Sequence, residues 1–110
     1  MSTQESIINR KFNFETEIAY ASDAIVSKTL IKTNGGTLTL FAFDKDQELS
    51  EHSASFDVLV QLMDGKGEFI VGGVPHHLSK GECLIMPADI PHAVKATEAF
   101  KMLLTMIKKI

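Results

Sequence analysis

Residues 81–92 read Gly-Glu-Cys-Leu-Ile-Met-Pro-Ala-Asp-Ile-Pro-His and are the most informative part of the chain. The glycine is typical of a turn, and the apolar residues that follow it predict a short strand. Pro87 and Pro91 then indicate a loop, because proline has no backbone N–H to donate to a central strand. His92 ends this loop at the start of another strand candidate, residues 93–96.

Short strand candidates separated by turn signals fill the chain from about residue 18 onward. Residues 24–32 are rich in β-branched and aliphatic side chains, and the Asn34-Gly35 pair after them predicts a hairpin. Residues 37–43 alternate strictly and carry bulky side chains on both faces, which indicates a sheet packed on both sides. Residues 58–62 are strongly apolar and are expected to end in a hairpin at Asp64-Gly65. This regular spacing is typical of an all-β sandwich or barrel.

Length and composition favour one compact domain with one site. The chain has 110 residues, 45% hydrophobic and 23% charged, which are ordinary values for a folded domain. A net charge of -3 argues against a nucleic-acid binder. A single cysteine excludes an internal disulfide and fits a reducing compartment, so we expect a cytoplasmic protein. The sequence shows no apolar run long enough for a signal peptide or a membrane span, so we expect no membrane partner.

Two regions are expected: an N-terminal leader, residues 1–17, and a β-barrel domain, residues 18–110. Phe12-Asn13-Phe14 alternates within the polar leader. Two phenylalanines on a free tail would be costly in water, so we expect this segment to add a strand to the edge of a sheet. The sheet is either its own or that of a second copy, and the second case predicts a homodimer.

Residues 81–92 resemble the second motif of the cupin family, which has a glycine, five residues, a proline, one residue, usually a glycine, two residues and a histidine. Gly81, Pro87 and His92 match that pattern. Asp89 replaces the usual second glycine, and aspartate tolerates a left-handed backbone better than most residues. Ala96 replaces the usual final asparagine. The resemblance implies a small single-domain protein of the RmlC-like cupin superfamily, a jelly-roll barrel of two antiparallel sheets.

The first cupin motif has a histidine, one residue, a second histidine, three or four residues, a glutamate, six residues and a glycine. With its end placed on Gly65, the chain offers His52 at the first position but Ala54 and Val58 where the second histidine and the glutamate are expected. In metal-binding cupins three histidines and that glutamate hold the ion, so the resemblance implies a degenerate site here. Fewer than three protein ligands hold Zn, Ni, Fe or Mn poorly.

Alternation predicts a largely apolar pocket. If the strand stays regular, one face carries His52, Ala54, Phe56, Val58, Val60 and Leu62, and His92 approaches from the opposite sheet. We therefore predict a ligand pocket formed by His52, Ala54, Phe56, Val58, Val60 and His92. In the alternative, this wall is packed core, filled by Met63, Met86, Met102 and Met106 or their neighbours.

Three functions follow, and the sequence leaves them open. In the first, the barrel binds a small organic ligand without a tightly held metal, with His52 and His92 as polar contacts. In the second, His52 and His92 hold a divalent metal (Fe, Mn, Ni or Zn), helped by water or another side chain, and catalyse a dioxygenase or isomerase step, as the resemblance implies. His76, His77 and Gln61 are the candidates for that further ligand, although Gln61 is on the opposite face by alternation. In the third, the chain is an interaction domain with a vestigial pocket.

Overall fold

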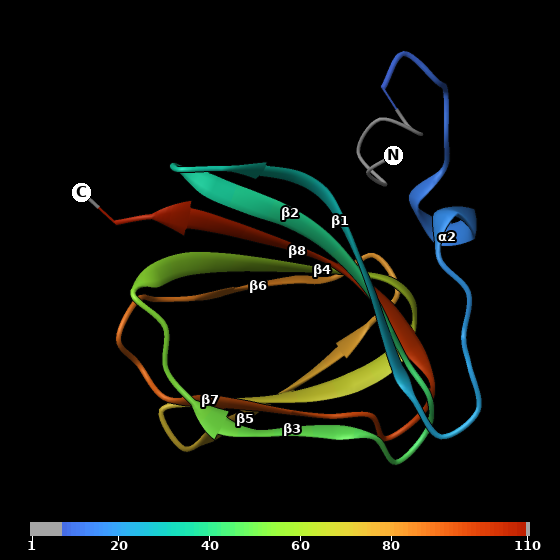
Figure 1. Ribbon diagram of the computed structural model, residues 1–110. Helices are drawn as coiled ribbons and strands as arrows, with labels where there is room; N and C mark the ends of the chain where they lie inside the picture. Colours follow the sequence, from blue (N-terminus) through green and yellow to red (C-terminus); the bar gives the residue numbers. More distant parts are fainter. Residues whose placement is uncertain (1–7, 110) are drawn as a thin grey trace.

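The computed structural model describes residues 8–109, which form a barrel of antiparallel strands with one short helix outside it (Figure 1). The elements are α2 (Phe14–Glu17), β1 (Ile25–Thr33), β2 (Gly36–Phe43), β3 (Glu48–His52), β4 (Phe56–Val71), β5 (Val74–Ser79), β6 (Cys83–Met86), β7 (His92–Lys95) and β8 (Phe100–Lys108). The predicted all-β, jelly-roll architecture is confirmed. In residues 8–109 no helix has the length and apolar character needed to cross a membrane.

The long strand β4 belongs to both sheets. Its first half pairs with β8 and β6, which gives one sheet in the order β1-β2-β8-β4-β6. Its second half pairs with β7 and β5, which gives the other sheet in the order β3-β7-β4-β5. Both sheets are therefore joined through one continuous backbone, and Figure 1 shows them facing each other.

The prediction of a hairpin at Asp64-Gly65 is wrong, because β4 continues through these residues. The pairing of β4 with β8 shifts register between Leu62 and Asp64, and Gly65 has a φ of 75°. A Cβ at Gly65 would lie 1.9 Å from the carbonyl oxygen of Ala99. The Asp-Gly pair therefore makes a bulge that bends a continuing strand instead of reversing the chain, because close backbone packing on β8 requires glycine here.

Two other glycine turns form hairpins, and the sequence predicts the first of them. Asn34 and Gly35 connect β1 to β2, whose register pairs Thr33 with Gly36. Gly72 and Gly73 connect β4 to β5, with φ values of 56° and 81°. Both residues of this second turn adopt the left-handed backbone that a tight hairpin requires.

Aromatic side chains fill one part of the barrel interior. Phe43, Phe69 and Phe100 are fully buried, and the rings of Phe43 and Phe100 stack with centroids 4.6 Å apart. Each buried phenylalanine contributes about 2 to 3 kcal/mol of transfer free energy. Further along β8 the inward positions are taken by Met102, Leu104 and Met106, where packing is less complete.

A second apolar cluster lies on the outer face of the sheet that contains β1, β2 and β8. Its buried members are Ile18, Leu30, Leu40, Ala42 and Leu103. Strand β2 thus packs on both faces, as its alternation predicts, because Leu40 and Ala42 point outward while Phe43 points into the barrel core.

The N-terminal segment covers this outer cluster but does so without forming a strand. Phe12 and Phe14 pack against it, and the Asn13 side chain accepts a hydrogen bond from the Glu15 backbone N–H to begin α2. Residues 12–17 therefore differ from the expected edge strand, because a local helix cap satisfies the backbone. Residues 1–7 of the predicted leader lie outside the described residues, and the homodimer stays a prediction.

We predict that Gly65→Ala destabilises the barrel much more than Gly73→Ala. Both glycines have a left-handed φ, but a Cβ at Gly73 meets nothing within 4 Å, whereas at Gly65 it meets the Ala99 backbone. Urea denaturation should show a loss of about 1 kcal/mol for Gly73→Ala and at least about 3 kcal/mol for Gly65→Ala. Equal losses would show that backbone crowding at the β4 bend is unimportant.

Candidate functional site

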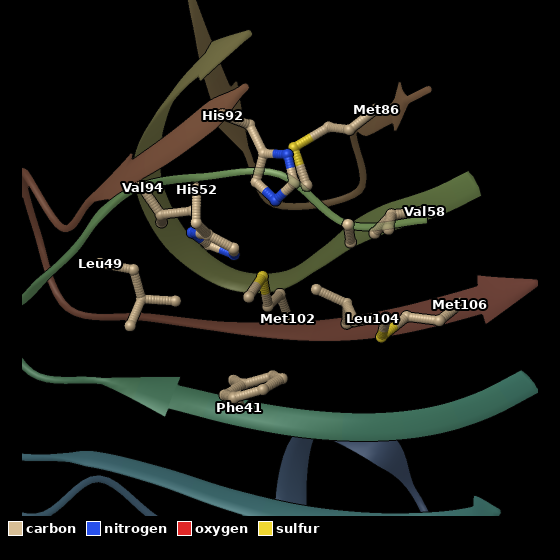
Figure 2. A pocket seen from close by; sticks show the side chains of 11 residues that line it. Phe41, Leu49, His52, Val58, Met86, His92, Val94, Met102, Leu104 and Met106 are labelled. Atoms are coloured by element: carbon tan, nitrogen blue, oxygen red, sulfur yellow. The ribbon is translucent and has the colours of Figure 1, made fainter. Parts of the chain in front are cut away.

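A cavity of about 170 Å³ lies between the two sheets, beyond the packed phenylalanines. Its wall consists of Phe41, Leu49, His52, Ala54, Val58, Met86, His92, Val94, Met102, Leu104 and Met106. Figure 2 shows the two imidazole rings on one side of the cavity, with Met102, Leu104 and Phe41 on the other. The histidines are the polar members of an otherwise apolar wall.

The two histidines are direct cross-strand partners. His52 ends β3 and His92 begins β7, and the register of these strands places the residues opposite each other. Their rings meet edge to face, with centroids 4.4 Å apart and an angle of 66° between the planes. Adjacent strands of one sheet thus bring together residues that are far apart in sequence.

Backbone carbonyls orient both rings. His52 Nδ1 lies 2.9 Å from the carbonyl oxygen of Ser50, and His92 Nδ1 lies 3.2 Å from that of Ile90. A carbonyl oxygen only accepts hydrogen bonds, so in each case Nδ1 is the protonated nitrogen that donates. When such a ring is neutral, its Nε2 is unprotonated and keeps a free lone pair.

The two histidines differ in exposure. His92 is 5% exposed, whereas His52 lies exposed at the end of β3. Burial lowers the pKa of His92 below its ordinary value, and the nearby His52 lowers it further, although the hydrogen bond to Ile90 opposes both effects. His92 is therefore a neutral imidazole near pH 7.

The loop that carries His92 is fastened to β4 and to the residues just before and just after that strand. The Asp57 carboxylate accepts a hydrogen bond of 2.9 Å from the Ala88 N–H, and the Ala54 carbonyl accepts one of 2.7 Å from the Asp89 N–H. The Pro91 carbonyl accepts a third, of 2.8 Å, from the Gly72 N–H. These three bonds hold the loop between β6 and β7, and so set the position of His92.

Four of the six residues predicted for the pocket lie on the cavity wall: His52, Ala54, Val58 and His92. Phe56 and Val60 do not. The regular alternation expected from residue 52 to residue 62 is wrong, because β3 ends at His52 and β4 begins at Phe56 in the other sheet. Val60 is completely buried in the packed core, and Phe56 is half-buried at the start of β4.

The prediction that His92 approaches the cavity from the sheet opposite His52 is also wrong. His92 shares a sheet with His52, because β7 pairs with β3. Of the candidate helper ligands, His77 pairs with Glu68 at 2.9 Å on the surface, and neither it nor His76 nor Gln61 lines the cavity.

Several wall residues either fill the barrel in the packed-core alternative or were not identified from the sequence. Met86, Met102 and Met106 line the cavity instead of filling it, whereas Met63 packs against the outer cluster. Phe41, Leu49, Val94 and Leu104 were not predicted to face a pocket. Alternation along β2 and β8 was the available signal, since Met102, Leu104 and Met106 are two residues apart.

Residues 40–108 match the model of the cupin domain. The chain belongs to the cupin family. Its structure is similar to that of a conserved protein of unknown function from Streptococcus pyogenes, with a TM-score of 0.88 and 33% identity over 92% of this chain and 89% of that one. It is also similar to a cupin 2 conserved barrel domain protein from Leptotrichia buccalis, with a TM-score of 0.86 and 43% identity over 88% of this chain.

The cupin chain spans 47% of the Leptotrichia buccalis protein. An RmlC-like cupin from Desulfovibrio desulfuricans has the same fold, with a TM-score of 0.77 and 24% identity over 89% of this chain and 95% of that one. No curated protein matches this cupin.

The second cupin motif has the backbone that its sequence predicts. Asp89, which replaces the usual glycine, has a φ of 66°. Gly81, at the first position of the motif, has a φ of 89° in the turn between β5 and β6. The unusual aspartate thus adopts the left-handed conformation that this loop requires.

The residues present do not fit the metal of metal-binding cupins. His52 and His92 offer two nitrogen ligands, and the neighbouring wall positions Ala54 and Val58 have no lone pair. Across residues 8–109 no group of three or more histidine, cysteine, aspartate or glutamate side chains is placed to hold an ion. The four-ligand site of metal-binding cupins is therefore not formed by the described side chains.

We predict that His92 makes the stability of the barrel depend on pH. The pKa of His92 in the folded protein lies below the ordinary value of 6.5, so as pH falls the unfolded chain binds a proton at this histidine before the folded protein does. Stability is then lost as pH falls through the unfolded pKa toward the folded one. In urea denaturation at about pH 7.5 and about pH 5.5, His92→Gln should lose less stability on acidification than the wild type. His76→Gln, outside the cavity, should keep the wild-type pH dependence, and the same dependence in His92→Gln would contradict the assignment.

Proposed function

We propose that this cupin binds a small organic molecule inside the barrel, without a tightly held divalent metal and with His52 and His92 as its polar contacts. The observation that carries the proposal is the cavity itself, an apolar wall with two convergent imidazoles. A concave apolar site with a few placed polar groups is the usual form of a small-molecule site.

Two features distinguish this cavity from leftover space in a core. First, the adjacent core is filled by the fully buried side chains of Phe43, Phe69 and Phe100, whereas the cavity lies beside the two histidines. Second, several hydrogen bonds hold the loop and both rings in place. Fixed polar groups on rigid elements are what recognition of a ligand requires.

The alternative is a metal-dependent enzyme of the dioxygenase or isomerase type that uses His52 and His92. One observation favours it: an Nδ1–H that donates to a backbone carbonyl, with Nε2 left free, is the usual arrangement of a metal-binding histidine. Against it, Ala54 and Val58 occupy the wall where further ligands would be needed.

Two further expectations belong to this proposal. A cytoplasmic location is supported by the single cysteine of the chain, Cys83, which is a free and exposed thiol. A homodimer is supported by apolar side chains on the outer face around β6, where Ile85 and Ile107 are 66% and 59% exposed.

We predict that filling the cavity abolishes ligand binding while leaving the barrel folded. Ala54→Leu adds three carbon atoms to the wall at a half-buried position, and Ser55→Leu places the same side chain on the neighbouring exposed position. Screening single-ring molecules by ligand-observed NMR should give hits with the wild type and with Ser55→Leu, and none with Ala54→Leu. Hits that survive Ala54→Leu, or an absence of hits with the wild type, would contradict binding in this cavity.

Metal analysis separates the proposal from its alternative. Protein purified without a chelator should contain far less than one Fe, Mn, Ni or Zn per chain, and added metal should not raise the melting temperature. Near-stoichiometric metal that is lost in His52→Ala and His92→Ala, but kept in His76→Ala, would overturn the metal-free proposal.

A further inference from the structure

The ring nitrogens that face the cavity are hydrogen-bond acceptors. Both Nδ1 atoms donate to backbone carbonyls, so each neutral ring offers only the lone pair of Nε2 to a ligand. Within residues 8–109, every fully buried side-chain nitrogen or oxygen has a hydrogen-bond partner. The Nε2 of His92 has no such partner, so this atom is not fully buried and borders open space. Because His92 is 5% exposed and lines the cavity, that space is the cavity.

The remaining wall cannot neutralise an anion. None of the eleven lining residues is a lysine or an arginine. A carboxylate in the cavity would meet apolar carbon and sulfur atoms together with the Nε2 lone pair of His92, and burial of a charge without a partner is strongly unfavourable.

Size limits the ligand to about one ring. The cavity holds about 170 Å³. A dry apolar cavity of about 150 Å³ accommodates benzene, which sets the scale. Figure 2 shows the imidazoles above this space and Phe41, Met102 and Leu104 below it, so a ring in the cavity would lie between the histidines and these apolar side chains.

We infer that the cavity selects neutral single-ring molecules that carry an O–H donor, of the phenol class, with the hydroxyl donating to Nε2 of His92. This inference rests on the proposed function, since it names the chemical class of the ligand. A hydrocarbon of the same size would leave the acceptor at Nε2 unpaired, and a carboxylate would bring a negative charge to it.

The test compares four probes of similar size: phenol, anisole, toluene and benzoate. Anisole has the ring and the oxygen but no donor, and it is more apolar than phenol, so burial alone would favour anisole. By NMR titration we expect phenol to bind roughly tenfold more tightly than anisole or toluene, and benzoate not to bind.

Variants then locate the donor contact. His92→Phe keeps a ring but removes the acceptor, and we expect it to bind anisole at least as tightly as phenol. His76→Phe, outside the cavity, is the matched control and should keep the preference for phenol. If His92→Phe does not fold, long-range ¹H–¹⁵N spectra of the wild type test the same point, since we expect His92 in its Nδ1–H form, with the Nε2 signal shifting when phenol is added.

The outcomes separate the inference from the proposed function. Equal binding of phenol and anisole in the wild type, tighter binding of benzoate, or a protonated Nε2 on neutral His92 would overturn the inference and leave small-molecule binding standing. If none of the four probes nor any other single-ring molecule binds, the proposed function fails together with the inference.

Discussion

Strand β4 takes part in two sheets because its backbone bends at Gly65, where a positive φ and contact with the Ala99 carbonyl leave no room for a side chain. Its first half can then pair with β8 and β6, and its second half with β7 and β5. The two sheets face each other across the side chains that alternate along this strand. Val58 consequently lines the cavity, whereas Val60 and Leu62 lie in the packed core.

The histidine pair depends on the second half of this strand. Pairing with β4 positions β7, and β7 in turn pairs with β3, so His92 meets His52 at the end of that sheet. The loop before His92 is held by the Asp57 side chain and by backbone bonds to Ala54 and Gly72. Ring orientation then follows from two nearby carbonyls. The cavity is polar only on this side because the other side is formed by β2 and β8, whose inward residues are Phe41, Met102, Leu104 and Met106.

Most of the barrel could be predicted from local sequence patterns. Alternation in residues 37–43 correctly indicated a strand packed on both faces, and the aspartate at position 89 was correctly judged compatible with a left-handed backbone. The site was harder to predict from local sequence patterns. Whether Asp64-Gly65 reverses or bends a strand depends on what lies across from it, and here that is the Ala99 backbone, 34 residues away from Gly65 in the chain. Similarly, no local pattern shows that the chain changes sheets between His52 and Phe56.

The sequence by itself determined the strands, most of the turns, the cupin resemblance and the absence of histidine and glutamate at positions 54 and 58, because each of these depends on residue type and spacing alone. Tertiary structure alone decided which side chains share the cavity. Inward-facing residues from β2, β3, β4, β6, β7 and β8 meet there, together with Ala54 from the connection between β3 and β4. The contact between His52 and His92 also requires a register between strands that lie 40 residues apart in the chain. Such contacts arise only when the whole sheet closes, and no pattern within a single strand contains them.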